Sequence, residues 1–265
     1  MLNAADGRYT PAVGWAPQSK ERVPVVTVEK RKKESYSDDP LSFRNWQTIE
    51  EHTDAVFQRM MQILDFLCLA EVWRHQLLEG VRWHDAGKAH LSFQALIKTE
   101  ASERSKNYPV GKAPDNAWLK GRLPNRPRIG DARRKHFRHD LASGLLALQN
   151  SKPDLVSYLA AAHHGKVRLS IRSMPGEYKP TNGGRFARGV WDGDVVPEIE
   201  LGGSVRMAAT TIDLSYMDLG DGPNGQSWLS RMIALLDKPD LGPFRLAYME
   251  ALVKAVDEKA SRGGS

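Results

Sequence analysis

The chain has little of what defines several large classes of protein. It has one cysteine, Cys68, in 265 residues, so a disulfide framework and a cysteine-rich zinc module are both excluded. No apolar run approaches the roughly 18–20 residues that span a membrane, and residues 1–8 lack the apolar core of a signal peptide. We therefore expect a reducing, cytoplasmic setting and no membrane partner.

Negative charge is also scarce relative to positive charge. The 38 Lys and Arg side chains outnumber the 32 Asp and Glu side chains, and the formal net charge of +6 favours a polyanionic partner. The excess is concentrated in residues 98–139, which carry +8, and in residues 166–188, which carry +5. Aromatic residues lie within both stretches, and cations interleaved with rings suit a single nucleic-acid strand. The alternative is a solvated loop that is basic by chance, and charge alone does not decide between the two.

The pattern along the chain predicts a mostly α-helical fold. Residues 1–45 contain four prolines and no sustained period, which indicates an N-terminal arm or linker, and residues 46–262 form the predicted domain. Thr48 and Glu51 have the spacing of a capping box and begin a helix that continues to about Leu67. Further helices are expected over residues 69–83, 91–97, 139–149, 153–162, 228–236 and 243–260.

Long basic loops and a small β-hairpin complete the expected fold. Ile212, Leu214 and Tyr216 alternate in a segment rich in glycine and proline, which is typical of a short strand. Cys68 follows an apolar stretch and is expected to be buried. In the last helix, an apolar face is expected at Phe244, Ala247, Tyr248, Ala251, Leu252 and Ala255.

The histidines fall into groups that suit metal binding. His52, the pair His84–Asp85, His139 and the pair His163–His164 lie on or beside predicted helices. Imidazole nitrogen binds Zn, Fe and Ni well, and a carboxylate can bridge two cations, which imidazole cannot. One Asp among several His is therefore what a two-metal phosphoryl-transfer site needs. Spacing alone does not bring these groups together.

Sequence runs around these histidines resemble a known family. The run His84-Asp85-Ala86-Gly87-Lys88 resembles the signature of the HD superfamily of metal-dependent phosphohydrolases. A narrower resemblance is to the HD nuclease of CRISPR type I systems, on Phe93-Gln94, Arg138-His139-Asp140 and His163-His164-Gly165, where Asp140 stands in place of the family's Glu. Residues 39–42 and 242–252 resemble the I-G (formerly I-U) form, in which the nuclease is similar to the C-terminal part of a nuclease–helicase.

The resemblance implies a set of site residues. One metal ion would be held by His52, His84, Asp85 and Asp257. The other would be held by Asp85, His139, His163 and His164, with Asp85 as the bridge. Asp85 and Lys88 would be catalytic, Lys88 beside the scissile phosphate. Asp237 and Asp240 compete with Asp257 for the late Asp position.

The basic stretches supply the predicted nucleic-acid contacts. These are Arg133, Arg134, Lys135, His136, Arg138, Lys166 and Arg168, and His90 is a further contact or a neighbour of the ligands. The histidine-rich ligand set favours two divalent transition-metal ions (Mn, Fe, Co or Ni) over Mg alone.

The activity that the resemblance implies is hydrolysis of DNA phosphodiester bonds. We expect a metal-dependent HD nuclease domain over residues 46–262 that prefers single-stranded DNA and acts in CRISPR type I interference. Its expected partners are a helicase and an RNA-guided surveillance complex. The chain has no Gly-x-x-x-x-Gly-Lys-Ser/Thr run, so we expect either a stand-alone subunit or an excised domain. The alternatives are an HD-type phosphohydrolase acting on nucleotides and a DNA-binding domain without activity.

Overall fold

The structure is a computed structural model that describes residues 9–10, 14–15, 46–97, 109–119, 134 and 136–262. The chain divides into two units, Met1–Asp38 and Asp39–Ser265. In the first, β1 (Tyr9–Thr10) and β2 (Gly14–Trp15) form an antiparallel pair. Most of the predicted arm, residues 1–45, lies outside the described residues, and all that follows concerns the second unit.

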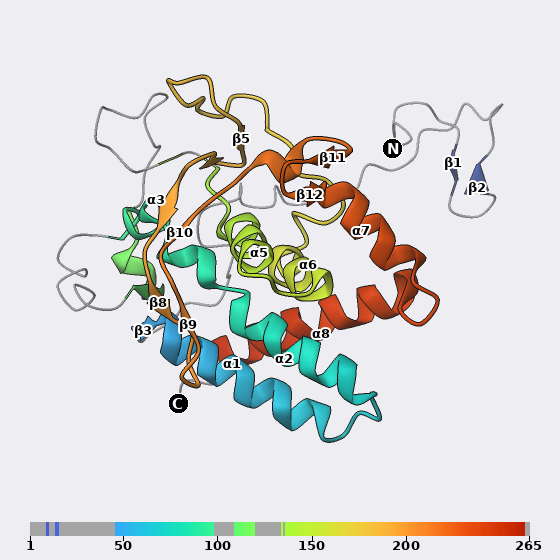
Figure 1. The fold of residues 1–265 in the computed structure, drawn as a ribbon. Helices are drawn as coiled ribbons and strands as arrows, with labels where there is room; N and C mark the ends of the chain where they lie inside the picture. Colours follow the sequence, from blue (N-terminus) through green and yellow to red (C-terminus); the bar gives the residue numbers. More distant parts are fainter. Residues whose placement is uncertain are drawn as a thin grey trace. The chain divides into compact units, whose positions relative to one another are not determined.

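The second unit is mostly α-helical, as predicted (Figure 1). Its α-helices are α1 (Ile49–Leu64), α2 (Glu71–Trp83), α3 (Leu91–Gln94), α5 (His139–Gln149), α6 (Asp154–Ala162), α7 (Trp228–Asp237) and α8 (Gly242–Arg262). The described residues also form the short 3-10 helices η2 (Ala86–Ala89), η4 (Asp115–Ala117) and η5 (Ser215–Met217). No described helix combines the length and apolarity that a membrane crossing requires.

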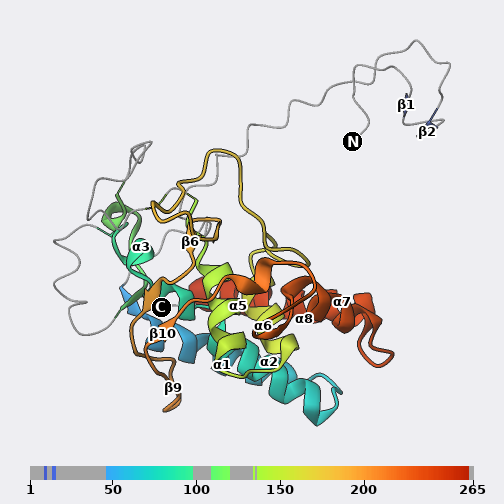
Figure 2. The same cartoon turned by 45° about the horizontal axis from the view of Figure 1, so that its top comes forward.

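Helices α5 and α6 pack side by side at the centre, and the other long helices surround them (Figures 1 and 2). Helix α2 contacts α6, while α1 packs against both α2 and α8. Nearly every residue of α5 and α6 is buried, so neither has a polar face. Gly144 allows this close packing, because a Cβ there would lie 2.7 Å from the Cβ of Ala161. Each fully buried Leu in this core, such as Leu145 and Leu159, contributes roughly 1.5–3 kcal/mol.

The predicted capping box at the start of α1 is confirmed. The Thr48 hydroxyl accepts from the Glu51 backbone N–H at 3.0 Å, and the Glu51 carboxylate accepts from the Thr48 N–H at 2.9 Å. The preceding strand β3 (Gln47–Thr48) pairs with β4 (Val110–Lys112). This pairing fixes part of the long basic segment beside the first turn of α1.

Short antiparallel pairs occupy the segment between α6 and α7. They are β5 (Phe186–Ala187) with β6 (Val190–Trp191), β7 (Val195–Val196) with β10 (Thr210–Thr211), β8 (Ile199–Glu200) with β9 (Arg206–Met207), and β11 (Asp221–Gly222) with β12 (Gly225–Gln226). These pairs confirm the predicted small β-hairpin, but its expected position at Ile212, Leu214 and Tyr216 is wrong. The Asp213 carboxylate accepts from the Ser215 N–H at 2.7 Å, and this Asx turn leads the chain into η5.

Two further predictions about burial are wrong. Phe244 and Tyr248, expected to face the core, are 90% and 45% exposed, and α8 instead buries Leu246, Met249 and Val253. Both faces of α8 carry apolar residues at helical spacing, so the period does not choose between them. Cys68 is exposed because α1 ends at Leu64, which leaves the cysteine in the connection to α2.

Candidate metal centre

The seven predicted metal ligands lie in one buried cluster, although five helices or helix ends supply them. His52 lies in the first turn of α1, His139 begins α5, and Asp257 lies on α8. The pairs His84–Asp85 and His163–His164 follow the last turns of α2 and α6. Asp85 is the centre of the cluster, because both of its carboxylate oxygens face imidazole nitrogens.

One side of Asp85 is formed by two histidines, a second carboxylate and two lysines. The Asp85 Oδ2 atom lies 3.6 Å from His52 Nε2 and 3.4 Å from His84 Nε2. The Asp257 Oδ1 atom lies 2.9 Å from His52 Nε2 and 3.9 Å from His84 Nε2. Because the ammonium groups of Lys88 and Lys112 also reach these carboxylates, we call this side the lysine half.

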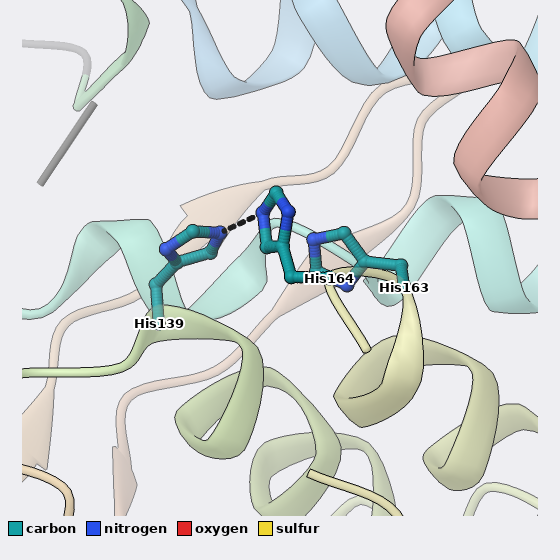
Figure 3. Close-up of side chains that lie close together, drawn as sticks. All are labelled: His139, His163 and His164. Atoms are coloured by element: carbon teal, nitrogen blue, oxygen red, sulfur yellow. Dashed lines mark hydrogen bonds between the residues drawn. The ribbon is translucent and has the colours of Figure 1, made fainter. Parts of the chain in front are cut away.

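The other side of Asp85 is formed by three histidines, which we call the histidine half (Figure 3). The Asp85 Oδ1 atom lies 3.5 Å from His139 Nε2 and 4.0 Å from His163 Nε2. His139 and His164 face each other with their Nε2 atoms 3.1 Å apart, and the ring of His163 lies beside that of His164. Three imidazole ligand atoms therefore lie within 4.8 Å of one another, and His139 and His163 also reach the same carboxylate oxygen.

Helix ends orient two of these histidines. The last carbonyls of a helix lack partners within it, and here they hold imidazoles. His84 Nδ1 lies 2.6 Å from the Val81 carbonyl, and His163 Nδ1 lies 2.8 Å from the Ala160 carbonyl. Each Nδ1 therefore carries the proton and donates it, which leaves the Nε2 lone pair directed into the cluster, as in metal-binding histidines.

Several buried atoms of the cluster have no hydrogen-bond partner within the described part of the chain. They include His84 Nε2, His163 Nε2 and Asp85 Oδ1. Lone pairs that face one another in a buried site are costly unless a cation lies between them. Imidazole nitrogens and carboxylate oxygens are suitable donors for such an ion, so these buried His and Asp groups could hold a metal ion.

Burial also sets the protonation of the cluster in favour of metal binding. Loss of hydration lowers the pKa of His52 and that of His163 to about 4, and it holds the pKa of His139 and of His164 well below the usual range. Burial alone would raise the pKa of Asp85, but its electrostatic interactions with neighbouring side chains, Lys88 among them, outweigh burial and hold that pKa well below its usual range. Neutral imidazoles and an ionised carboxylate are the ligand forms that a metal ion requires.

Two buried lysines touch the carboxylates, and sequence reasoning identified only one. Lys88 Nζ lies 2.7 Å from Asp85 Oδ2 and donates to the Gly111 carbonyl at 3.0 Å. Lys112, on β4, places its Nζ 3.4 Å from Asp257 Oδ1. Lys112 is one of twelve basic residues in a segment that reads as a loop, so no local signal distinguishes it. Of the three candidates for the late Asp, Asp257 is the one that lies in the cluster. Its carboxylate also accepts from the Ser261 hydroxyl at 3.4 Å.

The run that contains Asp85 is fixed against α5 and β4. Gly87 donates its N–H to the Ser143 hydroxyl at 2.8 Å, and the two backbones approach so closely that a side chain on Gly87 would collide with α5. The Gln94 side-chain amide donates to the Lys88 and Val110 carbonyls and accepts from the Val110 N–H, in the manner of a strand. These contacts set the distance between Asp85 and His139.

The arginine that precedes His139 belongs to a buried ion pair. Arg138 donates to both carboxylate oxygens of Asp140, at 3.0 and 2.7 Å, and Asp140 also accepts from the Leu141 N–H. Asp140 is fully buried. The Arg-His-Asp run of the sequence therefore anchors the start of α5, with His139 between the paired residues.

The other predicted nucleic-acid contacts have mixed surroundings. Arg133 and Lys135 lie outside the described residues, while His136 and Lys166 are exposed. Arg134 donates to Asp194 at 2.7 Å and stacks on the Trp191 ring, and Arg168 donates to Glu250 at 2.6 Å. His90 is buried with its Nε2 3.1 Å from Asp194 Oδ2. Acidic side chains therefore offset part of the positive charge counted in the sequence.

Comparison with known proteins returns no relative for this chain. No protein-family model, curated protein or solved structure gives a significant match.

Proposed function

We propose that this protein is a metal-dependent DNA nuclease of the HD type, which hydrolyses phosphodiester bonds and prefers single strands. The observation that carries the proposal is the position of Asp85, whose two carboxylate oxygens face two separate groups of histidines. A carboxylate between two nitrogen-rich groups is the arrangement that a bridged pair of metal ions requires.

The ligand set favours two transition-metal ions. His52, His84 and Asp257 would hold one ion, His139, His163 and His164 would hold the other, and Asp85 would bridge them. Mn, Fe, Co or Ni suit imidazole nitrogen better than Mg does, because Mg prefers an all-oxygen environment. When bound, such ions activate water and stabilise the negative charge that develops on a phosphate under attack.

The chain's own residues would orient the phosphodiester. The His139 side chain is 13% exposed, whereas those of His52, His84 and His163 are fully buried, so a phosphate would approach from the side of His139 and His164. The Lys88 ammonium, already within the cluster, can donate to a phosphate oxygen and offset its charge. Exposed His136 and Lys166 would contact the strand.

The proposed biological role depends on the sequence resemblance. Defence against foreign DNA in a CRISPR type I system would require a helicase and an RNA-guided complex to deliver the single strand. A cytoplasmic setting agrees with the single, exposed cysteine.

The test is cleavage of circular single-stranded DNA by protein stripped of metal, with Mg²⁺, Mn²⁺, Co²⁺, Ni²⁺ or Zn²⁺ added singly. We expect cleavage with a transition metal, and a loss of at least about 100-fold in Asp85→Asn, which keeps the side-chain volume. The matched control is Asp154→Asn. Asp154 begins α6 outside the metal centre, and its carboxylate is paired with Arg231. Cleavage of a circle also establishes endonuclease action. Full activity in Asp85→Asn would refute the proposal.

The second candidate is hydrolysis of nucleotides at the same centre. The ion pairs of Arg134, Arg138 and Arg168 favour it, because they reduce the positive charge available to a long strand. In matched metal, faster hydrolysis of nucleoside phosphates than of DNA would select this alternative.

A further inference from the structure

The two halves of the metal centre differ in the positive charge that already occupies them. In the lysine half, the Lys88 ammonium lies 2.7 Å from Asp85 Oδ2, and the Lys112 ammonium lies 3.4 Å from Asp257 Oδ1. In the histidine half, Asp85 Oδ1 lies 3.5 Å from His139 Nε2 and 4.0 Å from His163 Nε2. The centre is therefore asymmetric before any metal binds.

Lys112 lies where it competes directly with a metal ion. Its Nζ contacts the same Asp257 oxygen that lies 2.9 Å from His52 Nε2, so the ammonium shares a prospective metal-binding atom. The side chain is buried on β4, whose pairing with β3 limits its retreat. Repulsion between an ammonium and a divalent ion a few ångströms apart is strong in a poorly hydrated site.

We propose that Lys112 is a built-in counter-cation that makes the two metal sites unequal. The histidine half binds the first divalent ion tightly. The lysine half binds the second ion more weakly, because that ion must displace the Lys112 ammonium from Asp257. This inference rests on the proposed two-ion site and adds the order in which its halves are loaded, with Lys112 as a positioning residue.

The test is a calorimetric titration of metal-free full-length protein with Co²⁺, without nucleic acid. The wild type should bind two ions with dissociation constants at least tenfold apart. Lys112→Met, which keeps an unbranched side chain and removes the charge, should tighten the weaker step at least tenfold and change the tighter step less than twofold. Lys112→Arg, which keeps the charge, should retain the separation.

Further variants assign each step to a half and control for the loss of a lysine. His164→Asn should abolish the tight step, whereas Asp257→Asn should affect only the weak one. Lys152→Met is the matched control, because it removes an ammonium paired with Glu79 outside the centre, and it should titrate as the wild type does. Circular dichroism checks folding. If Lys112→Met does not fold, Lys88→Met tests the same half and should also tighten the weak step.

Three outcomes would overturn the inference. They are two ions of equal affinity in the wild type, an unchanged weak step in Lys112→Met or its substitute Lys88→Met, and loss of the tight step in Asp257→Asn. These outcomes are separate from the fate of the nuclease proposal. Two ions bound with equal affinity would still allow DNA cleavage. If the protein binds two ions with unequal affinity but does not cleave DNA when fully loaded, the nuclease proposal is refuted and the asymmetry stands.

Discussion

A methyl group on Gly87 should destabilise the protein and disturb the histidine half. The Cβ of Gly87→Ala would lie 2.8 Å from both Ala142 Cβ and Ser143 N, and it would collide with the His139 carbonyl oxygen. All three are rigid parts of α5, so the methyl group cannot be accommodated by a side-chain rotation. Overpacking of this kind costs about 1–3 kcal/mol, and we expect the upper end because backbone atoms must move.

The assay is thermal unfolding of metal-free protein, followed by Co²⁺ titration. A cost of about 3 kcal/mol corresponds to a fall in Tm of roughly 6–12 °C for a domain of this size. The tight Co²⁺ step should also weaken, because His139 moves away from Asp85. Gly222→Ala is the matched control, since its nearest neighbour would lie at an ordinary 3.9 Å. A Gly87→Ala protein that melts and binds Co²⁺ like the wild type would refute the reasoning.

Three more predictions concern protonation, ion pairing and thiol access. Because the pKa of His52 and of His163 lies at about 4 in the folded protein and near 6.5 when unfolded, the unfolded chain binds more protons between these values. Stability of the metal-free protein should therefore fall as the pH falls from 6.5 to 4, by up to about 1.4 kcal/mol per pH unit for each histidine, and a flat Tm over this range would contradict the assignment. Arg138→Met should lower the free energy of unfolding in urea by about 3–5 kcal/mol, because it leaves the buried Asp140 charge without its partner. The double substitution Arg138→Met with Asp140→Leu should recover most of that loss. Cys68 should react with a thiol reagent in native buffer at the rate of an exposed cysteine, and protection until denaturant is added would contradict its position.

Features encoded by nearby residues could be predicted from the sequence. The capping box needs only Thr48 and Glu51, three residues apart, and the continuous apolar run of α6 predicts a buried helix. The histidine and aspartate groups stood out as short runs, but their meeting at one point was an expectation from resemblance. No spacing between Asp85 and His139 encodes the contact of Gly87 with α5 that brings them together.

Features decided by distant residues could not be predicted. Lys112 is buried because β4 pairs with β3, across more than sixty residues of chain. Counting charges predicted a basic path, but it could not show that Arg134 would meet Asp194 or that Arg168 would meet Glu250. In α8, two apolar faces compete, and packing against α1, α2, α6 and α7 selects the one with Met249 and Val253.

The contact between His52 and Asp257 has a consequence for the order of folding. It joins residues 205 positions apart, so the lysine half closes a loop that includes most of the domain. Closing so long a loop costs conformational entropy, and the packing of α8 on α1 offsets that cost. A chain that has not yet docked α8 can gather the three histidines of the other half but not Asp257. The complete centre is therefore among the last features to form, and a partly folded chain lacks it.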